Sequence, residues 1–143
     1  MDITSENLVR TKMRQIAPDV ILHAAAFTRV DDAETNREKS FQINAQGTRN
    51  VAVAAAECQA SLVYYSTDYI FSGQCSIPYQ ESDLPDPVNY YGFTKLQGER
   101  EIQSLCPAHL IIRTSWLFGK GGENFVCTIA RAARERGELE VVE

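Results

Sequence analysis

Short apolar runs alternate with longer amphipathic segments along this chain, and the alternation restricts the fold more than any other feature. Residues 5–17 place Leu8, Val9 and Met13 at helical spacing, and residues 18–26 then form an apolar run typical of a strand. The same succession occurs three more times, with helices predicted over 34–58, 89–105 and 123–137 and strands over 61–66, 109–116 and 139–142. Strands separated by helices form right-handed crossovers and a parallel sheet. The sequence predicts the α/β class, a doubly wound, Rossmann-like sheet with helices on both faces.

Size and charge narrow the possible partners. The 143 residues suffice for one domain, and 44% hydrophobic with 23% charged residues is the composition of an ordinary globular protein. No apolar run approaches the roughly 18 residues of a membrane span, and no signal peptide is expected. The net charge is −5, and lysine and arginine are scattered among acidic residues. We therefore expect neither a membrane nor a nucleic-acid partner.

Cysteine and histidine patterns give no sign of a metal site. The four cysteines are far apart and form no C-x-x-C pair: Cys58, Cys75, Cys106 and Cys127. This spacing argues against zinc and favours free thiols in a reducing compartment, so a cytoplasmic location is expected. His23 and His109 border or interrupt apolar runs, where a packed or hydrogen-bonded histidine is more common than a metal ligand. Neither is assigned a functional role.

Polar and aromatic residues follow three of the predicted strands directly. The stretches are AAAFTRV (24–30), STDY (66–69) and RTSW (113–116). In doubly wound sheets, ligands bind beyond the carboxyl ends of the strands, so these residues are expected on one rim. The long irregular segment 69–89 follows the second stretch, and a loop of that length in a compact domain is usually functional. The alternative is that Ser66, Thr67 and Asp68 are ordinary turn formers at a strand exit.

Tyr91 and Lys95 are spaced i, i+4 at the start of the predicted helix 89–105, so they share one helix face. A free tyrosine has a pKa of about 10, and a positive charge within about 4–6 Å lowers it toward neutral pH. Such a tyrosine can act as a general acid. A chance surface pair is the alternative for any isolated Y-x-x-x-K. Here the pair accompanies a strand-end hydroxyl, that of Thr67.

Several motifs together resemble one enzyme family. STDYIF, then YGFTK after a loop that carries PYQESD, then RTSWLFG followed by NFV are similar to the dTDP-4-dehydrorhamnose reductases of the extended short-chain dehydrogenase/reductase superfamily. The resemblance covers essentially all of the chain. Y-x-x-x-K alone defines only the superfamily, whereas the spaced set is more specific. The resemblance implies reduction of the 4-keto group of a dTDP-linked deoxysugar, in dTDP-L-rhamnose biosynthesis, by NADPH or NADH.

The resemblance also assigns catalytic and substrate-binding residues. Tyr91 would donate a proton to the carbonyl oxygen, Lys95 would lower the pKa of Tyr91 and hold the nicotinamide ribose, and Thr67 would hydrogen-bond the reacting oxygen. Asp68 and Trp116 match substrate contacts, a carboxylate for sugar hydroxyls and an indole for a flat or apolar face. For Trp116 the alternative is a core aromatic residue.

Cofactor contacts follow from the same resemblance. Asp2 and Ile3 match a loop that touches the adenine, and Ala26, Phe27 and Thr28 match the strand end on which the cofactor backbone lies. Tyr91 and Lys95 complete this set. Asn44 matches a position that orients the helix and a water molecule near the lysine, although an asparagine on a helix surface is the commoner case.

The departure from the family lies at the ends of the chain. The 143 residues contain no G-x-x-G-x-x-G turn, which binds the pyrophosphate in full-length relatives. The chain is therefore expected to be a middle fragment, a partial NAD(P)-binding domain of one unit with an incomplete sheet. Residues 19–25 would then lie at an unpaired sheet edge. The segments that build the sugar-nucleotide lobe and the dimer contacts of full-length, homodimeric relatives would also be missing.

Two further interpretations stay open beside the reductase. One is a non-catalytic sugar-nucleotide or partner-binding module of the same fold, which keeps the rim without the cofactor turn. The other is a nucleotide-sugar epimerase or dehydratase, although STDYIF followed by RTSW favours the reductase branch. The sequence leaves open the choice between NADH and NADPH, and the identity of the nucleotide sugar.

Overall fold

The computed structural model describes residues 1–119, 121 and 124–136, and it divides into two compact units, Met1–Arg113 and Thr114–Glu143. The elements follow one another in this order along the chain: α1 (Glu6–Ile16), β1 (Val20–His23), α2 (Val30–Thr35), α3 (Arg37–Phe41), the π-helical η1 (Gln42–Gly47), α4 (Thr48–Glu57), β2 (Ser61–Thr67), the 3-10 helix η2 (Asp68–Ile70), α5 (Tyr90–Leu105), β3 (His109–Thr114) and α6 (Phe125–Arg136). Each predicted helix and strand up to residue 136 is present. The predicted strand 139–142 lies outside the described residues.

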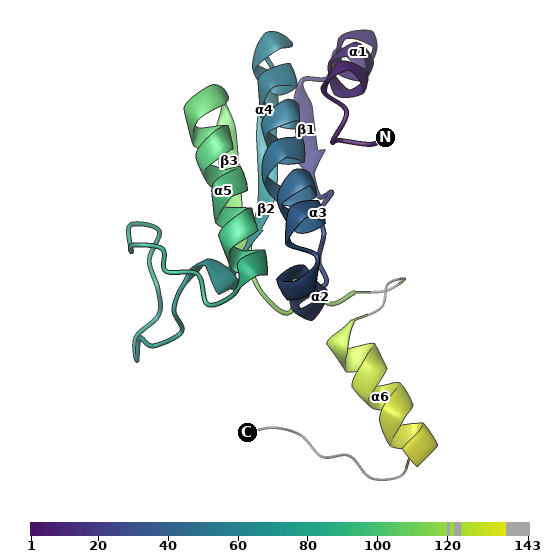
Figure 1. Cartoon of the computed structure of the whole chain (residues 1–143), viewed down its shortest axis with the longest axis vertical. Coiled ribbons are helices and arrows are strands. Elements are labelled where there is room, and N and C mark those ends of the chain that lie inside the picture. Colours follow the sequence, from purple (N-terminus) through teal and green to yellow (C-terminus); the bar gives the residue numbers. More distant parts are fainter. Residues whose placement is uncertain (120, 122–123, 137–143) are drawn as a thin grey trace. The chain divides into compact units, whose positions relative to one another are not determined.

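The sheet has the order β1-β2-β3, and β1 pairs with β2 in parallel, with Leu22 opposite Val63. Strand β1 therefore lies at one edge, as the sequence predicts for residues 19–25. The α/β class and the Rossmann-like succession of strand and helix are confirmed (Figure 1).

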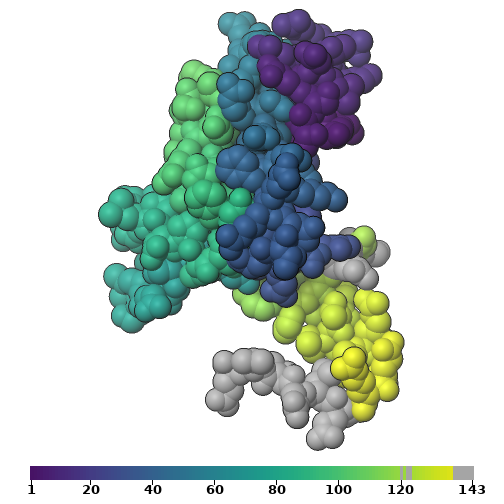
Figure 2. Space-filling model, in the orientation of Figure 1, coloured from purple at the N-terminus to yellow at the C-terminus, as the bar shows by residue number. Residues whose placement is uncertain are grey.

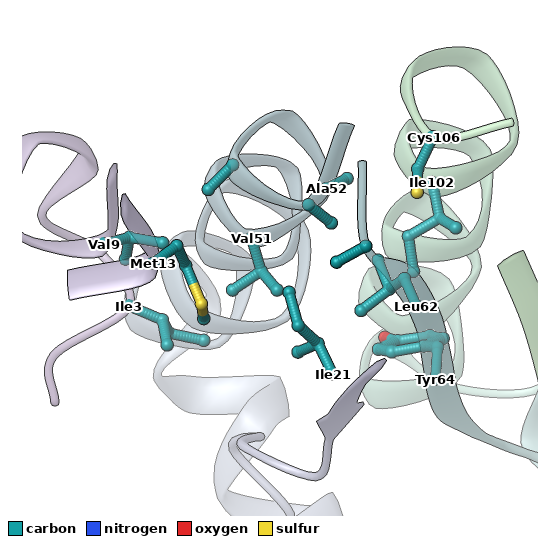
Figure 3. Close-up of a cluster of buried hydrophobic side chains, with 13 residues drawn as sticks. Ile3, Val9, Met13, Ile21, Val51, Ala52, Leu62, Tyr64, Ile102 and Cys106 are labelled. Atoms are coloured by element: carbon teal, nitrogen blue, oxygen red, sulfur yellow. The ribbon is translucent and has the colours of Figure 1, made fainter. Parts of the chain in front are cut away.

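The described helices of the first unit pack on one face of the sheet. Figure 3 shows Ile21 and Leu62 from the strands meeting Val51 of α4 and Ile102 of α5 in one buried cluster. Side chains alternate between the two faces of a strand. On the other face, Val20, Leu22 and Leu110 are 54%, 66% and 57% exposed. The sequence predicts helices on both faces of the sheet. In residues 1–113 the described helices cover one face only.

Local signals explain where the helices begin and end. Asn89 is the N-cap of α5, since its side chain accepts a hydrogen bond from Gly92 N at 2.8 Å. Helix α1 ends at Ile16, and the C-cap Ala17 still donates its N–H to the Met13 carbonyl while its left-handed φ of 47° turns the chain out of the helix. The segment 69–89 has little regular structure and projects beside α5 (Figure 2, teal).

The described part of the chain contains no helix with the length and hydrophobicity to cross a membrane. It also brings together no group of three His, Cys, Asp or Glu side chains suited to a metal ion. All four cysteines are free thiols.

His23 is a buried structural histidine at the end of β1. Its Nε2 lies 3.0 Å from the Thr48 hydroxyl, and its ring centroid lies 5.3 Å from that of Tyr64. Burial, together with the charge of Lys95, lowers the pKa of His23 to about 4.

The low pKa of His23 makes stability depend on pH. Between pH 6.5 and about 4 the unfolded chain binds a proton at this histidine that the folded chain excludes. The contribution of neutral His23 to the free energy of unfolding is complete above pH 6.5. It is lost as the pH falls toward 4, and the total loss is roughly 3 kcal/mol. Urea unfolding over this range should show the loss, and the His23→Gln variant should reduce the slope. A His23 ring that titrates near 6.5 by NMR would contradict the prediction.

Candidate active site

The rim begins at Thr67, where strand β2 ends. Thr67 is buried and caps the 3-10 helix η2, because its hydroxyl accepts a hydrogen bond from Tyr69 N at 3.2 Å. The same hydroxyl donates to Asp68 Oδ1, also at 3.2 Å. Thr67 and Asp68 thus form a turn at the strand exit, as the alternative interpretation of these residues expects. This turn also holds the Thr67 hydroxyl and the Asp68 carboxylate side by side.

Helix α5 approaches this turn very closely at Gly92. A Cβ at Gly92 would lie 2.2 Å from the Tyr69 carbonyl oxygen and 2.8 Å from its carbon. Only glycine leaves room for this approach, which places Tyr91 beside the strand end. The Tyr91 and Tyr69 rings meet edge to face at 6.1 Å. The glycine of YGFTK therefore brings the tyrosine to Thr67.

Substitution of Gly92 by alanine is expected to destabilise the chain by about 1–3 kcal/mol or more, because the new methyl group meets backbone that has no free space to move. Thermal melting or urea unfolding measures the loss. Gly119→Ala is the matched control, since a Cβ at Gly119 has no atom within 4 Å. Equal stability of the two variants would show that α5 moves away from η2 at little cost.

Tyr91 holds its proton more tightly than a free tyrosine. Burial raises its pKa, a hydrogen bond with Thr67 offsets part of the rise, and the nearby Asp68 and Tyr69 raise it further. A protonated phenol beside a hydroxyl suits a proton donor to an oxygen atom.

Lys95 is buried on the same helix but its ammonium group has other partners. Nζ donates to the Tyr65 carbonyl at 2.7 Å and lies 4.0 Å from the centre of the Tyr64 ring. Burial lowers the pKa of Lys95 to about 7, against the opposing effect of Glu99. In this structure burial dominates the environment of the Tyr91 phenol, and the lowering of its pKa by Lys95 stays a prediction.

Asn44 is fully buried rather than on a helix surface. Its Oδ1 accepts from Phe27 N at 2.7 Å, and its Nδ2 donates to the Phe27 carbonyl and to the Thr94 hydroxyl, both at 3.0 Å. One side chain thus joins the loop after β1 to α5, next to Lys95. An asparagine within a run of small helical residues is a weak signal for such a role.

The residues predicted to contact a cofactor divide into two groups. Ala26, Phe27 and Thr28 line a cavity of about 370 Å³ together with Arg29, Asp32, Asn36 and Lys39. Its volume is in the range of ligand sites, and Lys39 beside the Arg29–Asp32 ion pair leaves a net positive charge that suits the phosphates of a dinucleotide. These residues therefore fit the cofactor.

Asp2 and Ile3 are not among the described residues that line this cavity. The Ile3 side chain is in the core, and its carbonyl accepts from Asn50 Nδ2 at 2.9 Å. Asp2 is exposed and accepts hydrogen bonds from Thr4, which lower its pKa. An adenine contact by Ile3 would have to use the main chain.

Trp116 belongs to the second unit, which is described by itself. It has a left-handed φ of 52°, which is uncommon for a residue other than glycine. Its side chain is 70% exposed, and its ring meets that of Phe125 edge to face at 4.9 Å. Within its own unit the Trp116 ring is thus largely exposed, and its role as a substrate contact stays a prediction.

Comparison with known proteins places the chain in a family. The family model described as RmlD substrate binding domain matches residues 1–143. The dTDP-4-dehydrorhamnose reductases of Salmonella typhimurium and Escherichia coli K12 are 46% and 45% identical over 141 residues, which is 99% of this chain and 47% of each relative. The chain thus spans about half the length of these relatives.

Solved structures agree with this match. The Bacillus anthracis dTDP-4-dehydrorhamnose reductase, solved in complex with NADP, has a TM-score of 0.94 and 46% identity over 97% of this chain and 50% of its own. The Clostridium acetobutylicum enzyme of the same name has a TM-score of 0.96 and 39% identity over 99% of this chain and 50% of its own. The chain belongs to the RmlD substrate binding domain family.

Proposed function

We propose that this chain carries the catalytic part of a dTDP-4-dehydrorhamnose reductase, which reduces the 4-keto group of a dTDP-linked deoxysugar with NADPH or NADH. The observation that carries the proposal is the meeting of Thr67 and a protonated Tyr91 at the end of β2, with Lys95 one turn further along α5. The names of the relatives support the substrate class, and the NADP complex of one of them supports the cofactor.

The proposed roles follow from the atoms available. The hydroxyl of Thr67 and the phenol of Tyr91 would bind the keto oxygen, and Tyr91 would donate its proton to that oxygen. A nicotinamide, when bound, supplies the hydride to the keto carbon. Lys95, with its low pKa, would bind the ribose and return a proton toward Tyr91. Asp68 would bind a sugar hydroxyl, with Trp116 against the sugar or the base.

Further proposals concern cofactor, location and assembly. Ala26, Phe27 and Thr28 would contact the dinucleotide along their cavity, with Asp2 and Ile3 toward the adenine. The free thiols support a cytoplasmic location. The full-length relatives are proposed to be homodimers.

A hybrid enzyme tests the reductase proposal directly. The 143 residues replace the matching 141-residue stretch of the Salmonella typhimurium reductase, which restores the rest of that chain. We expect this hybrid to consume NADPH in the presence of dTDP-4-dehydrorhamnose. A hybrid that folds and binds NADPH without turnover would contradict the proposal.

The non-catalytic module remains the second candidate, because the 143 residues contain no glycine-rich phosphate turn. It predicts that the 143-residue chain alone binds a dTDP-sugar in calorimetry while the hybrid stays inactive. The reductase proposal predicts the reverse, with no measurable NADPH affinity for the chain alone. Epimerase activity would appear as interconversion of sugar epimers by the hybrid.

A further inference from the structure

A buried ion pair links helix α5 to strand β3. Glu99 is 1% exposed, and it receives two hydrogen bonds from Arg113, from Nε at 3.2 Å and from Nη2 at 2.8 Å. A fork of this kind fixes the plane of the guanidinium group as well as its position. Arg113 is therefore held in one orientation by a carboxylate that is out of contact with water.

The same guanidinium group reaches the irregular segment 69–89. Its Nη1 donates to the Glu81 carbonyl at 3.3 Å, and its central carbon lies 5.2 Å from the centre of the Phe71 ring. Phe71 in turn stacks on Tyr79, with ring centroids 4.3 Å apart and planes within 7°. Arg113 thus contacts the segment near its start and, through Glu81, near its middle.

The two ends of the segment are part of the candidate active site. Tyr69 N bonds to the Thr67 hydroxyl, and the Tyr69 carbonyl accepts from Val88 N at 3.3 Å. Between these ends, Ile77 and Leu84 are exposed, so the apolar core holds little of the middle of the segment. The position of the middle of the segment therefore depends on the few contacts made from outside, and the bond from Arg113 is one of them.

We propose that Arg113, held by Glu99, is a positioning residue that fixes the segment 69–89, whose ends join the candidate site, and thereby sets the affinity for the sugar nucleotide. The inference rests on the proposed function, since it takes the rim as the substrate site. Arg113 itself is given no contact with substrate. Its effect passes through the Glu81 carbonyl and the Phe71 ring.

The variants are chosen so that folding survives. Removal of Arg113 alone would leave the Glu99 charge buried and unpaired, whereas replacement of both partners by apolar residues is often neutral. The double variant Glu99→Met with Arg113→Met therefore removes the link without an orphan charge. Arg113→Lys keeps a positive charge for Glu99 but lacks the fork that also reaches Glu81. Arg100→Met, at an exposed arginine of α5 outside these contacts, is the matched control.

Cleavage by the protease Glu-C reports on the segment without reference to activity. Arg113 bonds the carbonyl of the Glu81–Ser82 peptide bond, which Glu-C cuts. In the 143-residue chain we expect this bond to be cut about tenfold faster or more in the double variant and in Arg113→Lys, because cleavage follows the population of the open segment. Unchanged cleavage at Glu81 in a folded double variant would overturn the inference.

The hybrid enzyme then measures the consequence for substrate. The double variant is expected to raise KM for dTDP-4-dehydrorhamnose about tenfold with kcat changed less than about threefold, as for a loss of binding rather than of chemistry. The KM for NADPH and both constants of Arg100→Met should stay the same. If Glu-C shows that the segment is free in the double variant while the KM for dTDP-4-dehydrorhamnose is unchanged, the positioning role is overturned. An inactive parent hybrid would instead contradict the proposed function, while the Glu-C result still decides whether the link exists.

Discussion

The Tyr91→Phe variant of the hybrid enzyme is expected to lose about 10²–10⁴-fold in turnover, the usual cost of removing a positioned general acid. The substitution deletes one hydroxyl group and keeps the ring, so the edge-to-face contact with Tyr69 should survive. NADPH affinity should change little, because Lys95 and the loop after β1 are untouched. The measurement is the rate of NADPH oxidation at saturating substrate, with fluorescence titration of NADPH beside it.

Tyr90 offers a matched control on the same helix. Its ring lies 4.9 Å from the Arg37 guanidinium carbon, and its N–H donates to Glu34, so it belongs to the contact of α5 with α2 and α3. Tyr90→Phe removes the same hydroxyl type one residue away and should keep near-full turnover. Near-full turnover of Tyr91→Phe would remove Tyr91 from the mechanism.

The 143-residue chain alone is expected to self-associate at micromolar concentration. Val20, Leu22 and Leu110 are largely exposed on the face of the sheet that the described helices leave open, and β1 is an edge strand. An open apolar edge is a template for pairing with a second chain. Each such side chain gains roughly 1.5–3 kcal/mol on burial, against a net stability of only about 5–15 kcal/mol for a typical domain. Sedimentation velocity measures the outcome.

A charge on this edge should reverse the association. Leu22→Lys places an ammonium group on the open face and is expected to shift the chain toward monomer. Leu84→Lys is the control, since Leu84 is 90% exposed in the segment 69–89, away from any strand. A wild-type chain that sediments as a monomer and melts in one sharp transition would contradict the prediction and would favour the independent binding module.

The order of helices and strands was predictable because it depends on local periodicity. Helix 89–105 and strand 61–66 were expected within one residue of α5 and β2. The cover of the sheet was not predictable in the same way. The strand sequences are apolar on both faces. Which face a helix covers therefore depends on contacts between segments that are distant in sequence.

The candidate site was also predictable only where it depends on local spacing. The i, i+4 spacing of Tyr91 and Lys95 correctly placed both on one helix, but spacing could not show that the Lys95 ammonium turns to the Tyr65 carbonyl. Asn44 and Glu99 lie in ordinary helical sequence, and each has its partner many residues away, at Phe27 and Arg113. Long-range hydrogen bonds of this kind leave no periodic signal in a single chain.

The π-helical turn η1 gives one stretch of the chain an unusual sensitivity to length. Helices α3, η1 and α4 follow without a break from Arg37 to Glu57, and the wider turn over Gln42–Gly47 holds Asn44 against Phe27 while Val51 faces the sheet. Each residue of an α-helix advances about 100° around the axis. Deletion of one residue within this turn would restore regular winding but would rotate Ser40 and everything before it away from Thr94. Insertions and deletions should therefore be excluded between residues 42 and 47, so family members are expected to keep the same number of residues between Asn44 and Val51.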